Sequence, residues 1–200
     1  MNYDTGWEQN SILKVGINGF GRIGRLVCRN ILNLPNCKVV AINALSKPEF
    51  LAYKFKYDTV HGTFKGDLSW DESNLYIDGN KITVTNQRNP IDIHWEQSGA
   101  EYVCESTGFF TTTESANQHI LGGAKYVVIT APPKDNTPMF VMGVNQNKYI
   151  GQNIISNASC TTNCLAPLIK VIHNNFGIKE ALMSTIHSMT SNQLTVDGTP

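Results

Sequence analysis

A cysteine at the start of a predicted helix is the residue of this sequence most able to act as a nucleophile. Cys160 and Cys164 lie in a polar segment, 156–164, that an apolar helical pattern follows. Ser159 can cap that helix, and Cys160 then lies in its first turn, where the helix dipole lowers the pKa of a thiol. The alternative for Cys160 is a small buried residue, as many free cysteines are. Cys164 lies one turn deeper, beside apolar Leu165, so we expect it to be buried and structural.

A nucleophilic thiol needs a base, and the chain offers five histidines. His187 is the best candidate because it follows the strand-like run 181–186, close in sequence to the helix of Cys160. His173 falls inside the predicted helix and is expected to be structural. Spacing alone leaves the pairing open, and the remaining candidates are His61, His94 and His119.

Three glycines near the N-terminus predict a dinucleotide site. Gly19, Gly21 and Gly24 form a G-x-G-x-x-G turn between a strand-like run, 12–17, and a helical pattern, 22–32. In this context the first glycine takes the tight turn, the second lets the backbone approach a pyrophosphate, and the third lets helix and strand pack closely. The N–H groups at the start of the helix would then bind the phosphates.

The acidic residue that usually holds the adenine ribose is missing. Dinucleotide folds carry it about 20 positions after the glycines, bound to the ribose hydroxyls. Asn43 and Ala44 occupy that place, so Asn43 or backbone groups would have to hold the ribose. Nearby Lys47 could bind a 2′-phosphate instead, with an ordinary surface lysine as the alternative.

A nicotinamide cofactor beside an activated thiol indicates aldehyde oxidation. The thiolate attacks the aldehyde carbonyl to give a thiohemiacetal, hydride leaves for the cofactor, and a thioester remains. The acyl group then passes to water, phosphate or another nucleophile. The residues alone do not choose among these acceptors.

Composition and charge limit the other function classes. The chain has 200 residues, 41% of them hydrophobic, and 16 basic residues balance 16 acidic ones. This composition excludes long disorder and a globally basic surface, so we predict no dedicated nucleic-acid site. No apolar run approaches the roughly 18–20 residues of a membrane span, and the polar start lacks a secretory pattern. The odd number of cysteines favours reduced thiols in the cytoplasm, and no Cys/His cluster has zinc spacing, so we predict no metal site.

Alternating strand and helix patterns predict the elements that position these residues. The glycine turn belongs to a βαβ unit that ends in the strand 38–43, which makes the sheet parallel. A helix over 48–56, with Ser46 as a possible cap, and a hairpin of 75–77 and 81–84 follow. The remaining expected elements are strands at 102–104, 126–130, 140–144, 154–156 and 181–186, and helices at 113–121 and 165–176, the last entered from Cys160.

We therefore predict an α/β fold: a Rossmann-type, doubly wound parallel sheet followed by the start of an α+β catalytic domain. The expected parts are a polar N-terminal extension, 1–11, a dinucleotide-binding domain, 12–156, and an incomplete catalytic domain, 157–200. A part of about 40 residues cannot bury a sufficient core alone. It therefore belongs to a longer protein, or it packs on the first domain or on a partner.

Five blocks of the sequence resemble the phosphorylating glyceraldehyde-3-phosphate dehydrogenase family. They are VGINGFGRIGR at 15–25, FKYD at 55–58, ESTG at 105–108, MFVMGVN at 139–145 and SNASCTTNC at 156–164. The blocks stand in collinear order, and SNASCTTNC is highly specific. The resemblance implies NAD as cofactor, glyceraldehyde 3-phosphate and inorganic phosphate as substrates, and 1,3-bisphosphoglycerate as product. It also implies a cytosolic homotetramer that works in glycolysis.

The resemblance assigns site residues as well. It implies Cys160 as the nucleophile and His187 as the residue that activates the thiol and assists proton transfer. With the backbone N–H of Cys160, His187 would also bind the oxyanion. The resemblance adds Arg22, Ile23, Arg88 and Thr130 to the three glycines of the cofactor site, and it places substrate and phosphate at Ser159, Thr161 and Thr190.

The sequence departs from the family pattern in three ways. Ala44 stands where the family usually has an Asp, Leu194 stands where a Lys or Arg is common, and the family's chains are longer than 200 residues. Two alternatives stay open: an erythrose-4-phosphate dehydrogenase, which hydrolyses the thioester, and a non-catalytic NAD-binding module that ends at Pro200. Redox sensing by Cys160 would be a side property of the same thiol.

Overall fold

The fold is built around one sheet of eight strands. The computed structural model describes residues 12–190, so the predicted extension 1–11 and the departure at Leu194 lie outside the described residues. The strands run in the order β3-β4-β5-β2-β1-β6-β7-β8 across the sheet. Their bounds are β1 (Leu13–Asn18), β2 (Cys37–Asn43), β3 (Leu68–Trp70), β4 (Asn74–Ile77), β5 (Asn80–Thr85), β6 (Tyr102–Glu105), β7 (Tyr126–Ile129) and β8 (Ile154–Ser156).

The order of the strands reverses at β1, in the middle of the sheet. From β5 to β8 all neighbouring strands are parallel, whereas β3 and β4 form an antiparallel edge. The chain moves from β1 through β2 to β5 on one side, then crosses and continues through β6, β7 and β8 on the other. Ligands of such sheets bind outside the carboxyl ends of the strands at the point of reversal. The predicted α/β class with a Rossmann-type sheet is confirmed.

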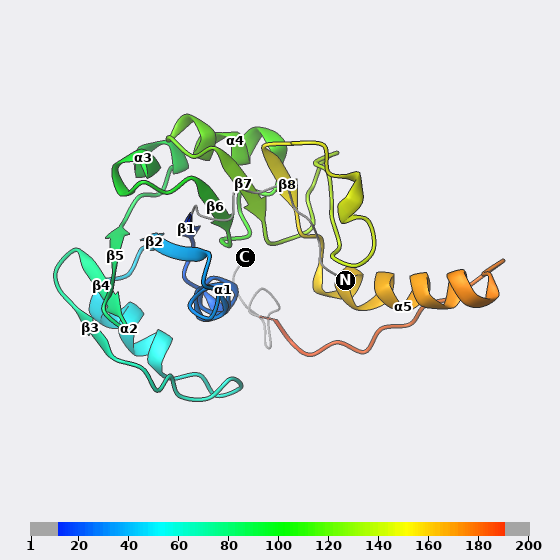
Figure 1. The fold of residues 1–200 in the computed structure, drawn as a ribbon, viewed down its shortest axis with the longest axis horizontal. Helices are drawn as coiled ribbons and strands as arrows, with labels where there is room; N and C mark the ends of the chain where they lie inside the picture. The colour runs from blue at the N-terminus through cyan, green and yellow to red at the C-terminus, as the bar shows by residue number, and fades with distance from the viewer. Residues whose placement is uncertain (1–11, 191–200) are drawn as a thin grey trace, which may run out of the picture.

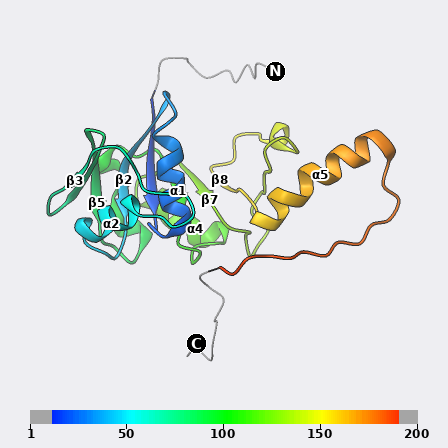
Figure 2. The same ribbon diagram turned by 90° about the horizontal axis from the view of Figure 1, so that it is seen from below.

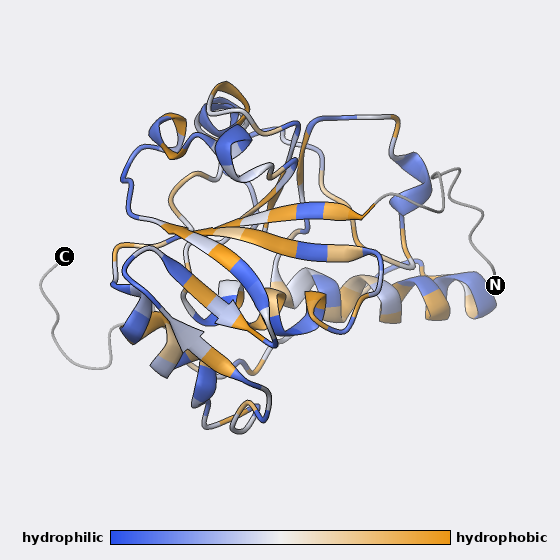
Figure 3. Ribbon diagram, turned by 60° about the vertical axis from the view of Figure 1, so that its left-hand side comes forward, coloured by the Kyte–Doolittle hydropathy of each residue, from blue (hydrophilic) through white to orange (hydrophobic). Residues whose placement is uncertain are grey.

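Helices cover both faces of this sheet (Figure 1). Two separate clusters of buried apolar side chains lie between helices and strands, one around Phe20, Leu51 and Phe55, the other around Trp95 and Ala116. The strands carry apolar residues along much of their length (Figure 3). The first cluster lies under α1 (Arg22–Ile31) and α2 (Pro48–Lys56), and the second under the 3-10 helix η1 (Pro90–Ile93), α3 (Trp95–Ser98) and α4 (Thr113–Leu121).

The last helix, α5 (Cys160–Phe176), projects away from the sheet (Figures 1 and 2). A short 3-10 helix, η2 (Gln146–Lys148), precedes β8. None of the residues of α5 is buried. The segment 177–190 has no regular structure and returns beside α5 toward the beginning of that helix (Figures 1 and 2).

Most predicted elements form close to their expected bounds. The helices expected at 48–56 and 113–121 match α2 and α4 residue for residue, and α5 begins at Cys160. The expected hairpin forms between β4 and β5. The sequence does not predict β3, η1 or α3, because each is short and packs against an element distant in the chain, namely α2, α4 and β2.

Three local predictions are wrong. The segment 140–144 forms no strand, and only the neighbouring Met139 makes a bridge, to Ser156. The segment 181–186 is irregular with exposed apolar residues, since no strand among the described residues pairs with it. Lys47, not Ser46, precedes α2, and no side chain caps that helix. Pro48 occupies the first turn, where its missing N–H reduces the need for a cap.

Candidate functional site

A tight turn between β8 and α5 places Cys160. Ala158 has a left-handed backbone with φ of 59°, which a residue other than glycine rarely adopts. Its N–H donates to Oγ of Ser156 at 3.0 Å, and Oγ of Ser156 in turn donates to the carbonyl of Ala131 at 2.7 Å. The side chain of Asn163 bonds to the carbonyls of Asn157 and Ser159, 2.7 and 2.9 Å away. The turn therefore holds the start of α5 against the end of the sheet.

Ser159 caps α5, as predicted. Its Oγ accepts from the backbone N–H of Thr162 at 2.9 Å, so it satisfies one of the N–H groups that have no partner within the helix. Cys160 follows as the first helical residue and is exposed. The alternative of a small buried residue therefore does not hold for Cys160. Cys164 is also exposed, so its expected burial is wrong: nothing among the described residues covers that side of α5.

The structure brings Cys160 and His187 into contact. Sγ of Cys160 lies 3.0 Å from Nε2 of His187. Nδ1 of the same ring lies 2.6 Å from the carbonyl oxygen of Ser188. A carbonyl oxygen only accepts, so Nδ1 carries a proton, and Nε2 is left to accept the thiol proton or to donate to a thiolate. The ring is thus oriented as a base toward the thiol, although it lies in an irregular segment and not at the end of a strand.

The pKa shifts of the two groups favour the same ionic state. The hydrogen bond to His187 lowers the pKa of the Cys160 thiol, and the backbone N–H of Thr161 lowers it further. The Ser188 carbonyl raises the pKa of His187, and the contact with Cys160 raises it as well. A lowered thiol pKa beside a raised imidazole pKa favours a thiolate–imidazolium pair, the reactive form of a cysteine.

The glycine turn lies at the carboxyl end of β1, and Gly19 and Gly24 have the tight turn and the close packing predicted for them. Gly19 has φ of 88°, and a Cβ there would lie 2.9 Å from backbone atoms of Ser106 and Thr107. A Cβ on Gly24 would lie 2.0 Å from the carbonyl oxygen of Gly19, so only glycine lets α1 approach the turn. A Cβ on Gly21 would meet nothing within 4 Å. Gly21 therefore faces open space, where the backbone can approach a ligand.

A cleft of about 570 Å³ opens beside this turn, at the point where the strand order reverses. Ser106 lines this cleft, and its Oγ is buried with no hydrogen-bond partner among the described residues. An unpartnered hydroxyl, the open face of Gly21 and the start of α1 fit a phosphate-containing dinucleotide. The lining residues are Asn18, Gly19, Phe20, Gly21, Asn43, Ala44, Leu45, Ser46, Leu51, Lys54, Gln87, Arg88, Ser106, Thr107, Phe109 and Phe110.

A row of polar side chains crosses the sheet behind this cleft. Asn43, Asn18 and Glu105 end the neighbouring strands β2, β1 and β6, and they are partners in register. Nδ2 of Asn43 donates to Oδ1 of Asn18 at 2.7 Å, and Nδ2 of Asn18 donates to Glu105 at 2.6 Å. All three side chains are buried. The other oxygen of Glu105 accepts from the backbone N–H of Thr107, so the row also fixes the loop that lines the cleft.

His119 of α4 extends this row beyond Glu105. Its Nδ1 accepts from the indole N–H of Trp95 at 3.1 Å, which leaves the proton on Nε2. Nε2 then donates to Glu105 at 2.9 Å. Because His119 is fully buried and both ring nitrogens are engaged, it is a structural residue and not a base for Cys160.

The predicted cofactor residues do not all meet at the cleft. Gly19, Gly21 and Arg88 line it. Arg22 and Ile23 begin α1 with exposed side chains outside the lining, and Gly24 is buried under the turn. Thr130 follows β7, where its hydroxyl donates to the carbonyl of Glu105 at 2.9 Å.

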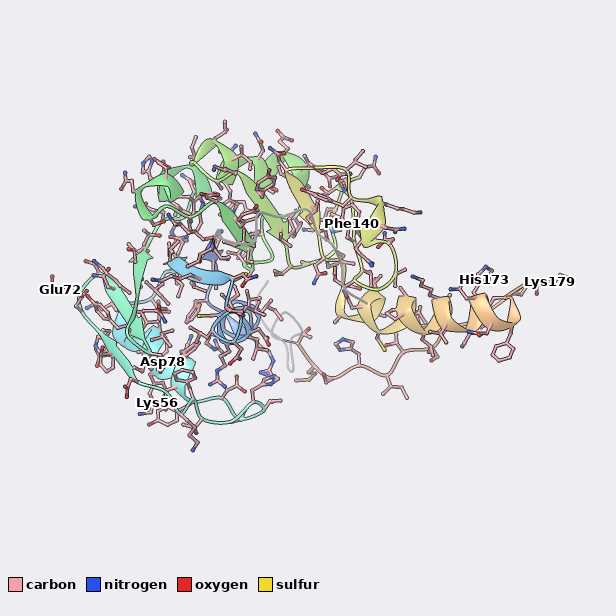
Figure 4. The ribbon with its side chains drawn as sticks, viewed as in Figure 1. Lys56, Glu72, Asp78, Phe140, His173 and Lys179 are labelled. Atoms are coloured by element: carbon pink, nitrogen blue, oxygen red, sulfur yellow. The ribbon has the colours of Figure 1, made fainter. Side chains whose placement is uncertain are left out.

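Two of the three predicted substrate residues are neighbours of Cys160 in the chain. Ser159 and Thr161 flank Cys160 in the chain, and the hydroxyl of Thr161 contributes to the lowered thiol pKa. Thr190 closes the described part of the segment that carries His187. His173 lies at the far end of α5 (Figure 4), where its Nδ1 accepts from the N–H of Ile178 at 3.3 Å. His173 therefore lies in the last turn of α5, whereas Cys160 lies in its first turn.

Sequence reasoning missed most of the polar row. The sequence shows that Asn18 follows the predicted first strand and that Glu105 belongs to the ESTG block. The hydrogen bond between them depends on the register of β1 and β6, which the sequence does not show. Asn43 is the exception, since the sequence offers it as a possible ribose ligand. Both ends of its amide are occupied by Asn18, Thr85 and Gln87, so that expectation is wrong.

Between residues 12 and 190, no helix is long and apolar enough to cross a membrane. The same residues contain no group of three or more His, Cys, Asp or Glu side chains that could hold a metal ion.

Two family models match parts of the chain. Residues 13–113 match the family model described as glyceraldehyde 3-phosphate dehydrogenase, NAD binding domain, and residues 159–200 match the model of its C-terminal domain. The chain is 56% identical over 188 residues to glyceraldehyde-3-phosphate dehydrogenase 2 of Trichoderma koningii, covering 93% of this chain and 55% of the relative. It is 55% identical over 186 residues to glyceraldehyde-3-phosphate dehydrogenase of Salmonella typhimurium, and 54% identical over 186 residues to glyceraldehyde-3-phosphate dehydrogenase A of Escherichia coli.

In each bacterial relative the match covers 93% of this chain and 56% of the relative. The chain thus spans about half the length of the curated relatives it matches. The family model over 13–113 coincides with the glycine turn, the row of polar side chains and the cleft, which makes NAD the cofactor of this part. The chain belongs to the glyceraldehyde 3-phosphate dehydrogenase family.

Proposed function

We propose that the protein oxidises glyceraldehyde 3-phosphate to 1,3-bisphosphoglycerate in glycolysis, with NAD as hydride acceptor and inorganic phosphate as acyl acceptor. The observation that carries this proposal is the distance of 3.0 Å between Sγ of Cys160 and Nε2 of His187. A thiol held against an oriented imidazole at the start of a helix suits attack on an aldehyde.

In the first step, Sγ of Cys160 attacks the carbonyl carbon of the aldehyde. A C–S bond forms, and the electron pair of the C=O bond moves to the oxygen, which takes a proton from Nε2 of His187. The backbone N–H groups of the first turn of α5 have no acceptors within the helix, so the N–H of Cys160 is available to stabilise the developing negative charge. The product is a thiohemiacetal on Cys160.

In the second step, His187 takes the hydroxyl proton back as the thiohemiacetal is oxidised to a thioester. Bound NAD supplies the acceptor for the hydride that leaves the former aldehyde carbon. A phosphate oxygen then attacks the thioester carbon, the C–S bond breaks, and Cys160 returns as a thiolate. The lowered pKa of the Cys160 thiol makes it a good leaving group in this last exchange.

The proposal assigns the remaining site residues. The open face of Gly21, the close approach at Gly24 and the unpartnered Oγ of Ser106 support the cleft as the place where NAD is held. Arg22, Ile23, Arg88 and Thr130 join the three glycines as proposed cofactor residues. Ser159, Thr161 and Thr190 are the proposed substrate and phosphate residues.

The proposal extends to the organisation of the whole protein. Residues 12–156 form the NAD-binding domain and 157–200 the beginning of the catalytic domain, in a homotetramer that works in the cytoplasm. Exposed apolar residues on α5 support further association of this helix: Leu168, Ile169, Val171, Ile172 and Phe176. Sedimentation of the complete protein measures the oligomeric state.

Turnover with two aldehydes tests the function. The purified protein and a Cys160→Ser variant are given glyceraldehyde 3-phosphate or erythrose 4-phosphate, with and without inorganic phosphate, and reduction of NAD is followed. We expect phosphate-dependent oxidation of glyceraldehyde 3-phosphate, abolished in the variant. Faster, phosphate-independent oxidation of erythrose 4-phosphate would favour erythrose-4-phosphate dehydrogenase. NAD binding without turnover of either aldehyde would favour a non-catalytic module.

A further inference from the structure

The end of β2 carries no acidic side chain toward the cofactor cleft. Ala44 follows β2, lines the cleft and is buried, and its N–H donates to the carbonyl of Thr85 at 2.9 Å. Dinucleotide folds that prefer NAD place a carboxylate at this point, where it accepts from the 2′-hydroxyl of the adenine ribose. A methyl group can neither accept that hydrogen bond nor repel a phosphate on the same oxygen.

No neighbouring side chain replaces the missing carboxylate. Asn43 uses both amide protons on Asn18 and the Gln87 carbonyl, and its oxygen accepts from Thr85 and the Gln87 N–H. Among the residues that line the cleft there is neither Asp nor Glu. The usual selection against a 2′-phosphate, which depends on a negative charge, is therefore absent from the described cleft.

The same cleft contains two cationic side chains. Lys54 comes from α2 and Arg88 from the loop after β5, and both line the cleft together with the hydroxyl of Ser46. Neither cation forms an ion pair with any residue between 12 and 190. Nζ of Lys54 lies 4.4 Å from the ring centroid of Phe50, a contact that leaves its charge uncompensated by any carboxylate. The charge of the lining is therefore positive, which suits an additional phosphate.

We propose that this cleft accepts the 2′-phosphate of NADP as well as the free ribose hydroxyl of NAD. Ala44 is the permissive residue, and Lys54 and Arg88 supply the cationic partners, with Ser46 as a hydroxyl donor. The proposal rests on the cofactor cleft of the proposed function and adds a second cofactor to it. It makes the position of Ala44 the main determinant of cofactor choice in this chain.

Calorimetric titration of the purified chain with NAD and NADP tests the proposal without any need for turnover. We expect NADP to bind within about tenfold of NAD, since no like charge opposes the 2′-phosphate. In Ala44→Asp, NADP should bind more than about tenfold more weakly, while NAD binds as well or better. The smaller ligands should respond in the same way: Ala44→Asp should weaken the binding of 2′-AMP, while 5′-AMP binds as well or better.

Two charge variants and a matched control identify the phosphate partners. Lys54→Met and Arg88→Met should each weaken the binding of NADP more than the binding of NAD. Lys125→Met removes an exposed cation that pairs with Glu101 at 3.3 Å, outside the cleft lining, and should change neither affinity. If the unmodified chain binds NAD but binds NADP more than about a hundredfold more weakly, the proposal is overturned, and the NAD site itself is not. An unchanged NADP/NAD ratio in Ala44→Asp would overturn it too, and failure to bind either dinucleotide would overturn the cleft itself.

Discussion

Sγ of Cys160 and Nε2 of His187 lie 3.0 Å apart, although 27 positions separate the two residues in the chain. One belongs to the first turn of α5, the other to an irregular segment that returns beside that helix. The Ser188 carbonyl fixes the tautomer of the ring, so the backbone next to His187 decides which nitrogen faces the thiol. The reactivity of Cys160 therefore depends on the segment after α5 as much as on the helix.

The first prediction concerns the pH dependence of Cys160 alkylation by iodoacetamide. Because the pKa of this thiol is lowered, the thiolate should form, and alkylation should accelerate, at lower pH than for an ordinary cysteine. His187→Ala removes the main cause of the shift, so the midpoint of the rate profile should rise. Peptide mass spectrometry follows Cys160 and Cys164 together. The profile of Cys164, which is exposed one turn further along α5, should not respond; an unmoved midpoint for Cys160 would contradict the assignment of His187.

The second prediction compares two glycines of the same turn. In Gly24→Ala the new Cβ would lie 2.0 Å from the Gly19 carbonyl oxygen, so we expect a loss of roughly 1–3 kcal/mol in the free energy of unfolding, with weaker NAD binding. In Gly21→Ala the Cβ meets nothing within 4 Å, so urea denaturation should show near-normal stability. NAD affinity should nevertheless fall, because the methyl group occupies the face that a pyrophosphate approaches. Equal stability of the two variants would refute the packing argument.

The third prediction concerns the buried carboxylate of Glu105. Glu105→Ala leaves donors of Asn18, His119 and Thr107 without their acceptor, so the free energy of unfolding should fall by about 3 kcal/mol. Thr130→Val is the matched control, since it removes one hydroxyl from the backbone carbonyl of the same residue and should cost about 1 kcal/mol. Urea denaturation measures both. A loss for Glu105→Ala no larger than that of the control would show that the row contributes little.

The fourth prediction concerns the left-handed residue before the thiol. Ala158→Gly should stabilise the turn by up to about 1 kcal/mol or leave it unchanged, because glycine adopts a φ of 59° without steric cost. Ala158→Val should destabilise it, since a β-branched residue is poorly tolerated there. Thermal unfolding measures stability, and the alkylation profile of Cys160 reports whether the start of α5 has moved. Higher stability of Ala158→Val than of Ala158→Gly would contradict the strained backbone.

Local signals were sufficient for the elements next to the candidate site. The glycines between an apolar run and a helical pattern predict β1 and α1, and Ser159 before an apolar helix predicts the cap that sets Cys160 in the first turn. These signals come from residues that are close together in the sequence, so they can be recognised from the spacing of residues alone. The SNASCTTNC block identifies Cys160 as the candidate nucleophile. Spacing alone gives His187 as only one of several possible histidine partners.

Long-range contacts explain what the sequence could not predict. The partnership of Asn43, Asn18 and Glu105 depends on the register of three parallel strands, which no local pattern specifies. The segment 181–186 has the composition of a strand but no neighbouring strand among the described residues, so its apolar side chains stay exposed. Cys164 precedes apolar residues in the sequence, as a buried residue would, but in the structure it lies on an exposed side of α5. In each case the decisive neighbour is distant in the chain.

The position of β1 in the middle of the sheet also determines when this chain can fold during its synthesis. The bond between Asn18 and Glu105 closes a loop of 87 residues, so β1 emerges from the ribosome long before its second partner, β6. Until then one edge of an apolar strand stays unpaired, and a parallel ladder cannot form by a local hairpin. We infer that β1, α1 and β2 stay partly folded until β6 has been synthesised. During slow translation of this stretch, the unpaired edge of β1 can aggregate or bind chaperones.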